Sequence, residues 1–307
     1  MSAQPIRYFD RYRRTLKTEQ VYGELWMRLA YGNPAGRLGV WLIARRAWFS
    51  RWYGWKMKKR ESALRILPFI AKYNLDVDEF AKSAFDYKTF NEFFCRALKP
   101  QARPIVPGER IAALPADGRH LAFPDVDAAD GFYIKGQKLS LTDLFGEGKG
   151  LDASPGSLAA RFAGGPILIS RLCPVDYHRF HFPVDGVPGE SRLVPGWLYS
   201  VSPIALRRNL SYLAANKRQL TLIESPVFGP VAMIEVGATN VGSIVQSFSA
   251  NRAVRKGDEK GFFSFGGSCV ITLFARGRVA FDADLIEQSR RQIETYARMG
   301  DRLGEAL

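Results

Sequence analysis

Residues 256–274 read K-G-D-E-K-G-F-F-S-F-G-G-S-C-V-I-T-L-F, with a Gly-Gly-Ser triplet immediately before an apolar run. The run from Cys269 to Phe274 predicts a strand, and the triplet before it is typical of a β-bulge or a hairpin corner. Because Gly266 and Gly267 are flexible, the triplet can instead hold a strained peptide in which Ser268 attacks the carbonyl carbon of Gly267. The pattern is not the Gly-x-Ser-x-Gly elbow of common hydrolases.

The segments around this stretch predict a strand-rich domain. Short apolar runs bounded by Gly and Pro are typical of strands, and four more occur at 166–170, 219–224, 231–236 and 243–248. The tail from Asp282 to Leu303 is charged with helical spacing, which predicts a C-terminal helix. Residues 101–307 are therefore expected to form a strand-rich, mainly antiparallel catalytic domain.

The first hundred residues have a different pattern. Apolar residues recur near a spacing of 3.6, which predicts helices, in the segments 21–31, 38–49, 63–73 and 89–98. The segment 99–110 holds three prolines and a glycine, which marks a boundary. The predicted fold class is α+β, with a basic helical part over residues 1–100 followed by the strand-rich domain.

Composition limits the class of protein. The chain has 307 residues, of which 47% are hydrophobic, so it can bury a core, and disorder of the whole chain is excluded. The formal net charge is +14, and the first hundred residues hold 20 basic and only 9 acidic side chains. Such an excess favours a polyanionic partner, either nucleic acid or an anionic membrane surface.

The segment from Trp41 to Arg60 concentrates this charge, because it holds four of the six tryptophans and seven basic residues. Tryptophan prefers the membrane–water interface and basic residues are attracted to anionic lipid, so the segment predicts a peripheral membrane contact. A helix packed on the protein's own core is the alternative. Single-stranded nucleic acid ranks last, because no nucleic-acid-binding motif supports it. The apolar run Leu38–Ala44 is too short to span a bilayer.

Three further clusters could carry chemistry. P-A-D-G at 115–118 is by itself a turn around Asp117, and the glycines of V-G-A-T-N-V-G-S-I at 236–244 indicate a tight passage. C-P-V-D-Y-H-R-F-H-F-P-V-D-G at 173–186 contains His178 and His181. A zinc site there would need three or four ligands, and no zinc-binding spacing is present. A surface loop with chance histidines is the other alternative.

Taken together, and in their order along the chain, the four clusters resemble the motifs of the phosphatidylserine decarboxylase family. P-A-D-G is similar to its aspartate motif, D-Y-H-R-F-H-F-P-V-D-G to its paired-histidine motif, and the run ending in G-G-S to its self-cleavage site. V-Y-G-E, Y-G-W, P-F-I-A-K-Y and F-N-E-F-F-C-R-A-L-K-P-Q-A-R-P resemble the N-terminal third of the shorter bacterial branch. The resemblance covers most of the chain.

The resemblance implies a precursor that makes its own cofactor. Cleavage between Gly267 and Ser268 would give a large chain (1–267) and a small chain (268–307) that stay together. Asp117 would orient His181, which would take the proton of Ser268, as in a serine–histidine–carboxylate relay. Ser268 would then become a covalent pyruvoyl group.

The resemblance further implies decarboxylation of phosphatidylserine to phosphatidylethanolamine, in phospholipid biosynthesis, through a Schiff base with the pyruvoyl ketone. His178 would protonate the carbanion. The alternatives are another serine-headed phospholipid as substrate, or a non-enzymatic peripheral membrane-binding protein on the same fold. The expected location is peripheral, on the cytoplasmic face of the cell membrane, with anionic phospholipid as partner, no nucleic acid, no metal and a possible homo-oligomer.

Two positions depart from common family patterns. Where much of the family has L-G-S-T at the cleavage site, this chain has Gly266 and Cys269 in place of Leu and Thr. Cys269 is expected to be a small buried side chain. The aspartate motif has Ala116 where Val is frequent, a change in volume that is expected to be harmless.

Overall fold

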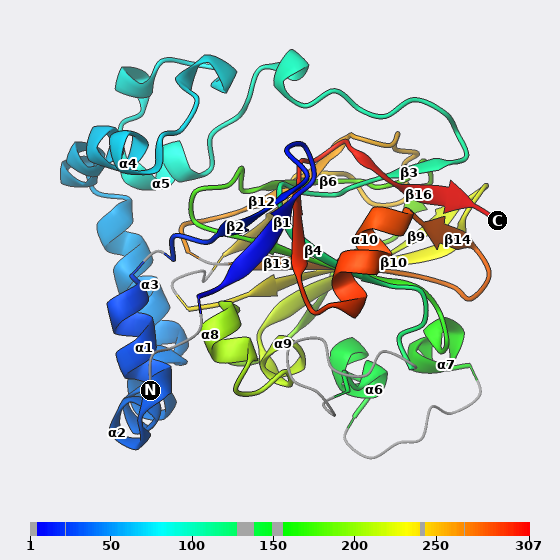
Figure 1. The fold of residues 1–307 in the computed structure, drawn as a ribbon, viewed down its shortest axis with the longest axis horizontal. Coiled ribbons are helices and arrows are strands. Elements are labelled where there is room, and N and C mark those ends of the chain that lie inside the picture. Colours follow the sequence, from blue (N-terminus) through cyan, green and yellow to red (C-terminus); the bar gives the residue numbers. More distant parts are fainter. Residues whose placement is uncertain (1–4, 22, 128–137, 149–155, 240–242, 267) are drawn as a thin grey trace.

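The computed structural model describes residues 5–307 except 22, 128–137, 149–155, 240–242 and 267. A ten-stranded sheet forms its centre (Figure 1), in the order β2-β1-β15-β4-β5-β13-β10-β9-β7, with β8 also paired to β9. All of its pairs are antiparallel except β1 with β15. The strands are β1 (Arg7–Asp10), β2 (Thr15–Thr18), β4 (Gly118–Phe123), β5 (Ile167–Leu172), β7 (Val187–Pro188), β8 (Arg192–Val194), β9 (Arg218–Ser225), β10 (Gly229–Gly237), β13 (Ser268–Phe274) and β15 (Glu294–Ala297).

The strand that follows the Gly-Gly-Ser triplet lies in the middle of this sheet. Every residue of β13 is buried, as is every residue of β5 beside it. Along β13, Ile271 and Leu273 face one hydrophobic core, whereas Val270 and Phe274 face the other. Burial on both faces explains the uninterrupted apolar run in the sequence. Cys269 is buried in the first of these cores, as expected.

Each face of the sheet is covered. Short helices pack on one face: α6 (Leu141–Phe145), α7 (Leu158–Phe162), α8 (Pro203–Leu206) and α9 (Tyr212–Ala215). Two small sheets cover the other, β11 (Ile244–Gln246)-β12 (Glu259–Phe263)-β6 (Arg179–His181) and β14 (Val279–Phe281)-β16 (Arg302–Ala306)-β3 (Ile111–Ala113). The helix α10 (Ala283–Arg290) packs beside β4 and β15.

The N-terminal helices form a separate layer at one side of the sheet (Figure 1). They are α1 (Glu24–Gly32), α2 (Pro34–Gly39), α3 (Ala47–Met57), α4 (Ile66–Tyr73) and α5 (Phe90–Phe94). Shorter helical turns join them: Val40–Ala44, Arg60–Arg65, Val77–Glu79, Ala84–Asp86 and Pro100–Ala102. A third, mainly aromatic core joins this layer to Phe265, the residue two before the predicted cleavage site. No helix among the described residues is long and apolar enough to span a bilayer.

The α+β class is confirmed, but two predictions of secondary structure are wrong. The helical interpretation of the first hundred residues misses the hairpin β1–β2, which belongs to the main sheet. The tail 282–303 is helical only over α10 and then forms β15 and the start of β16. Charge caused the second error, because Glu294 of β15 is buried in an ion pair with Arg171 rather than exposed on a helix.

Candidate active site

Three neighbouring strands bring the predicted residues to one edge of the main sheet. Asp117 directly precedes β4, Cys173 directly follows β5, and Ser268 opens β13. Ser268 pairs with Leu172 across one side of β5, and β4 pairs with the other side. A Cβ on Gly118 would lie 2.5 Å from the carbonyl oxygen of Arg171, so this tight approach requires glycine.

The paired histidines approach this edge from the small sheet. The backbone N–H of His181 donates to the carbonyl of Pro115 at 2.8 Å, and the N–H of Phe263 donates to the carbonyl of His178 at 3.0 Å. Strand β6 therefore lies between the Asp117 turn and the strand that leads to Gly266. The structure thus gathers the aspartate, histidine and serine motifs in one region.

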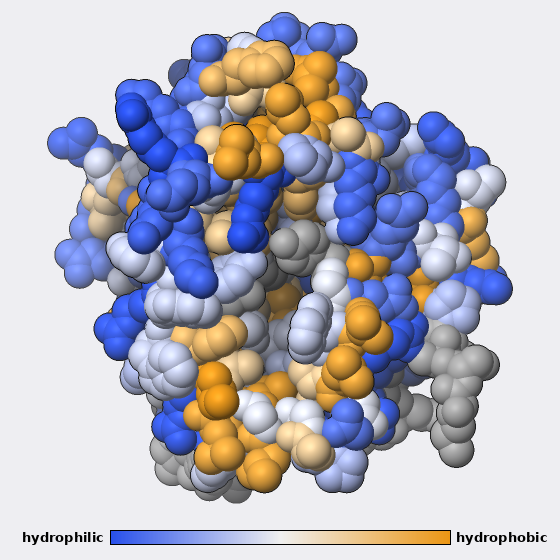
Figure 2. Space-filling model, turned by 90° about the vertical axis from the view of Figure 1, so that its left-hand side faces the viewer, coloured by the Kyte–Doolittle hydropathy of each residue, from blue (hydrophilic) through white to orange (hydrophobic). Residues whose placement is uncertain are grey.

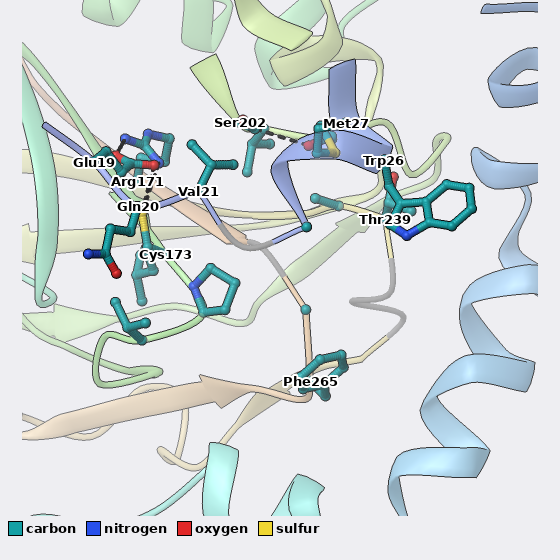
Figure 3. Close-up of a pocket in the computed structure, with 18 of the residues that line it drawn as sticks. Glu19, Gln20, Val21, Trp26, Met27, Arg171, Cys173, Ser202, Thr239 and Phe265 are labelled. Carbon is teal, nitrogen blue, oxygen red and sulfur yellow. Dashed lines mark hydrogen bonds and ion pairs between the residues drawn. The ribbon is translucent and has the colours of Figure 1, made fainter. Parts of the chain in front are cut away.

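A cavity of about 770 Å³ lies between this edge and the N-terminal helices (Figure 3). Such a volume is typical of small-molecule sites. Trp26 and Met27 of α1 line one side, and Arg171, Cys173, Phe265 and Gly266 are among the residues of the other. Gly266 has a φ of 138°, which side chains rarely adopt, so glycine suits this position.

Two buried polar atoms near the predicted cleavage site have no hydrogen-bond partner among the residues that the structure describes. They are Oγ of Ser268 and Nε2 of His178, and both residues are 0% exposed. Buried polar atoms are normally bonded, so these two are available for a reaction. The His178 ring lies on Phe94, with 3.8 Å between ring centroids, and its Nδ1 is 3.0 Å from the carbonyl oxygen of Asp176. That bond makes Nδ1 the donor and leaves the lone pair on Nε2.

Asp117 and His181 are near each other but are not hydrogen-bonded. Asp117 accepts from Nε and Nη2 of Arg103 at 2.8 and 2.6 Å and from the N–H of Met299 at 2.9 Å. Nδ1 of His181 is 2.9 Å from the Gly257 carbonyl oxygen, and its Nε2 is 3.3 Å from the Tyr177 hydroxyl. The relay implied by the resemblance is not a continuous line of bonds in this structure, and it stays a prediction. Gly267 lies outside the described residues.

Buried arginines that the sequence analysis missed support the site. Arg171 bonds Glu19 at 2.5 Å and Glu294 at 2.6 Å, and its Nη1 is 2.9 Å from Sγ of Cys173. Burial raises the pKa of Glu19, but Arg171 and Arg119 more than reverse this and lower it to about 2. Arg119 in turn pairs with Asp176, so the loop that carries His178 is held by buried charge. The sequence did offer one signal for this buried network, which is Arg171, the single arginine in the mostly apolar segment Ile167–Leu172.

Arg103 is the second feature that was missed. The sequence pattern around it was interpreted as a boundary, yet its guanidinium pairs with both Asp117 and Glu79. Burial alone would lower the pKa of Arg103. The carboxylates of Asp117 and Glu79 outweigh burial and raise this pKa above its usual value, so Arg103 stays charged. Arg103 therefore fixes the carboxylate of Asp117.

Among the described residues, a buried serine and a buried histidine with unbonded polar atoms lie near a cavity of substrate size, which is the arrangement expected of an enzyme active site. The family model for phosphatidylserine decarboxylase matches residues 90–305. Among similar proteins, the phosphatidylserine decarboxylase proenzyme of Fusobacterium nucleatum subsp. nucleatum is 40% identical over 304 residues, which cover 99% of each chain. The proenzyme of Chlamydia pneumoniae is 42% identical over 303 residues, 99% of this chain and 98% of the relative. The chain therefore belongs to the phosphatidylserine decarboxylase family, which confirms the resemblance.

The buried histidines predict a pH-dependent stability. Burial lowers the pKa of His178 to about 3 and of His120 to about 4, and it also lowers the pKa of His181. Unfolded histidine titrates near 6.5, so between pH 6.5 and 4 the unfolded state binds protons that the folded state does not. The free energy of unfolding is therefore expected to fall as the pH is lowered from 6.5 towards 4, by about 1.4 kcal/mol per pH unit for each of His178 and His120. Urea unfolding of the uncleaved Ser268→Ala variant at pH 7.5 and pH 5 measures this, and equal values would contradict it.

Proposed function

We propose that this protein decarboxylates phosphatidylserine to phosphatidylethanolamine and carbon dioxide, using a pyruvoyl group formed from Ser268. The main supporting observation is the buried Oγ of Ser268, which has no hydrogen-bond partner among the described residues and lies two positions after Gly266, a residue that lines the cavity. Conversion of this serine therefore breaks no hydrogen bond of its hydroxyl group to the described residues. Family membership supports the reaction, because the relatives are named as proenzymes of this activity.

Self-cleavage is the first step of the proposal. Oγ of Ser268 loses its proton and attacks the carbonyl carbon of residue 267, and the peptide C–N bond breaks as the acyl group moves to oxygen. Elimination from the ester leaves a carboxylate on residue 267 and dehydroalanine at residue 268. Water hydrolyses the dehydroalanine, through its imine form, to a pyruvoyl group and ammonia. That group supplies a carbonyl that combines with the substrate amine and withdraws the electrons left when carbon dioxide departs.

We assign the proton of Ser268 to His181 during self-cleavage, with Asp117 orienting the imidazole. Because Asp117 is bonded to Arg103 and His181 to Tyr177 and Gly257 in this structure, the assignment requires a small rearrangement of these side chains. A histidine with a lowered pKa is neutral at neutral pH and can accept a proton.

We assign proton donation during decarboxylation to Nε2 of His178. The support is its placement, because the His178 ring lies on Phe94, and the ring centroid of Phe94 is 4.9 Å from that of Phe265, the residue before Gly266. With Nδ1 fixed on the Asp176 carbonyl, Nε2 is the atom that takes up a proton and returns it.

The two histidines should therefore separate two activities. We expect the wild type to give a small chain of residues 268–307 on denaturing mass spectrometry. His178→Gln should still be cleaved but lose decarboxylation by about a hundredfold or more, whereas His181→Gln should remain at full length. If His178→Gln stayed at full length and His181→Gln were cleaved, these roles would be overturned. An uncleaved wild type would overturn the pyruvoyl mechanism.

The N-terminal layer supports a membrane-bound location, which we propose to be peripheral and on the cytoplasmic face. Trp41, Trp48 and Trp55 are 50%, 54% and 55% exposed, which argues against burial in the protein's own core. Lys56 and Lys59 lie over tryptophan rings of α3, at 4.1 and 3.8 Å from the ring centroids. Figure 2 shows this face, with hydrophobic patches around a hollow and hydrophilic side chains between them.

Charge reversal on this face tests the location. Lys56→Glu/Lys59→Glu is expected to lower binding to vesicles containing phosphatidylglycerol by more than about tenfold, since each basic residue contributes about 1 kcal/mol. The matched control is Arg290→Glu/Arg291→Glu, which changes the net charge equally around the exposed end of α10, away from the N-terminal layer. Equal losses in both variants, measured by vesicle flotation, would indicate net charge rather than this face.

A further inference from the structure

Two hollows meet at one lysine. Besides the cavity beside Gly266, an open groove of about 370 Å³ lies on the N-terminal layer and is lined mainly by apolar side chains, among them Met57, Leu64, Pro68 and Phe90, together with the exposed Arg65. Lys72 and Tyr73, at the end of α4, line both hollows. The cavity and the groove are therefore neighbours along a single path.

An aromatic row follows this path from the cleavage segment to α4. The ring centroids of Phe265 and Phe90 are 5.3 Å apart, those of Phe90 and Phe69 5.3 Å, and those of Phe69 and Tyr73 4.8 Å. Phe265 is adjacent in sequence to Gly266, and Tyr73 is adjacent to Lys72. The row thus connects Phe265, beside Gly266, with Tyr73, beside the Lys72 that the cavity and the groove share.

The charges that line the cavity are Glu19, Arg171 and Lys72. Glu19 and Arg171 neutralise each other, and Arg171 is also bonded to Glu294. Lys72 is exposed and forms no ion pair with any carboxylate of the described residues; its ammonium lies 5.4 Å from the Tyr73 ring centroid. Lys72 is the cation at this cavity that an anionic ligand could use without breaking a buried pair.

We propose that Lys72 binds the phosphodiester of the phospholipid substrate and that the groove beyond it holds one acyl chain. The inference rests on the proposed function. A serine headgroup, a phosphate and an acyl chain follow one another in the lipid, and the residue at position 268, Lys72 and the groove follow one another along the path. The amine would thus reach position 268 while the ammonium of Lys72 neutralises the phosphate.

Soluble dihexanoyl-phosphatidylserine, below its micelle concentration, tests the phosphate contact without a membrane. Lys72→Glu is expected to raise KM about tenfold or more, because a bond to a charged group is lost, with self-cleavage unchanged and kcat within about twofold. Lys72→Arg should stay near the wild type. Lys88→Glu is the matched control, since Lys88 is exposed on the same layer and lines neither hollow. An unchanged KM in Lys72→Glu, or an equal rise in Lys88→Glu, overturns the proposal.

Binding gives a readout that does not depend on turnover. Trp26 lines the cavity, so titration of the wild type with dihexanoyl-phosphatidylethanolamine should change tryptophan fluorescence, and Lys72→Glu should weaken that binding by the same factor as KM. If the wild type binds this lipid in a Lys72-dependent manner but does not decarboxylate phosphatidylserine, the proposed function fails and the binding site stands. If the wild type is active and Lys72→Glu binds the lipid as tightly as the wild type, the proposed binding site is wrong and the proposed function stands.

Chain length tests the groove. Extending both acyl chains from six to seven carbons should lower the KM of the wild type, because each buried methylene favours binding. Leu64, which lines the groove and is 81% exposed, can be changed without opening the core. Leu64→Gln should reduce this gain while leaving the KM for the six-carbon lipid within about twofold of the wild type. An equal gain in both proteins would exclude the groove as the acyl site.

Discussion

Ser268→Ala is expected to leave the protein as a single chain of 34.4 kDa and to abolish decarboxylation. The Oγ atom is the only part of the side chain that is removed, and it forms no hydrogen bond to any residue that the structure describes, so the change is expected to cost little stability. Without that oxygen no ester forms, and both activities should fall by about a thousandfold or more. Denaturing mass spectrometry and release of carbon dioxide measure the two losses.

A neighbouring serine provides the control for this variant. Ser264 lies in the same segment, four residues earlier, and Ser264→Ala should be cleaved and active like the wild type. If Ser268→Ala still separates into chains of residues 1–267 and 268–307, another residue cuts the precursor and the assignment of Ser268 is wrong. If it remains intact but decarboxylates, the reaction does not use a group formed at this position.

The second large effect concerns a buried ion pair in the core behind the site. Lys260 of β12 and Glu235 of β10 are both 0% exposed, and the lysine Nζ lies 2.9 and 3.0 Å from the two carboxylate oxygens. Burial lowers the pKa of Lys260, and Glu235 opposes that shift. Lys260→Met leaves the carboxylate without its cation, which is expected to cost about 3–5 kcal/mol.

The double variant distinguishes the pair from simple packing. Lys260→Met/Glu235→Met removes both charges and should recover most of the lost stability, since buried pairs replaced by apolar residues are often neutral. Gln246 bonds both Lys260 and Glu235, so recovery is expected to be incomplete. Urea unfolding in the Ser268→Ala background, where the chain is uncut, measures each value. Equal costs for Lys260→Met with and without Glu235 would show that the charge is not responsible.

Local patterns predicted the elements whose neighbours are close in the sequence. The strand after Ser268 and the order of the aspartate, histidine and serine motifs were evident because an apolar run and short motifs are local properties. The strand β15 was not, because Glu294 resembles a solvent-facing residue until Arg171, more than a hundred positions away, is placed opposite it. Buried charge therefore conceals strands from an analysis of periodicity.

The site was predicted only in part for the same reason. Asp117, His178 and Ser268 belong to short motifs, whereas Trp26 and Lys72 reach the cavity only because helices from the first hundred residues fold against the edge of the sheet. Nothing in the sequence around either residue marks it as a lining residue. Their place depends on tertiary packing, which the sequence pattern does not encode locally.

The position of β13 has a consequence for the assembled protein. A cut before Ser268 makes residues 268–307 a separate polypeptide, yet these residues supply the strand between β5 and β10 and, in β15, the strand between β4 and β1. Because this fragment would supply strands at two places of one sheet, the processed protein would be an obligate two-chain complex whose chains were never free. Folding of the precursor is unimolecular, whereas reassembly after denaturation is bimolecular and depends on concentration. Cleavage after folding would therefore spare the two chains from ever having to find each other, and only the denatured, processed protein would face a bimolecular step.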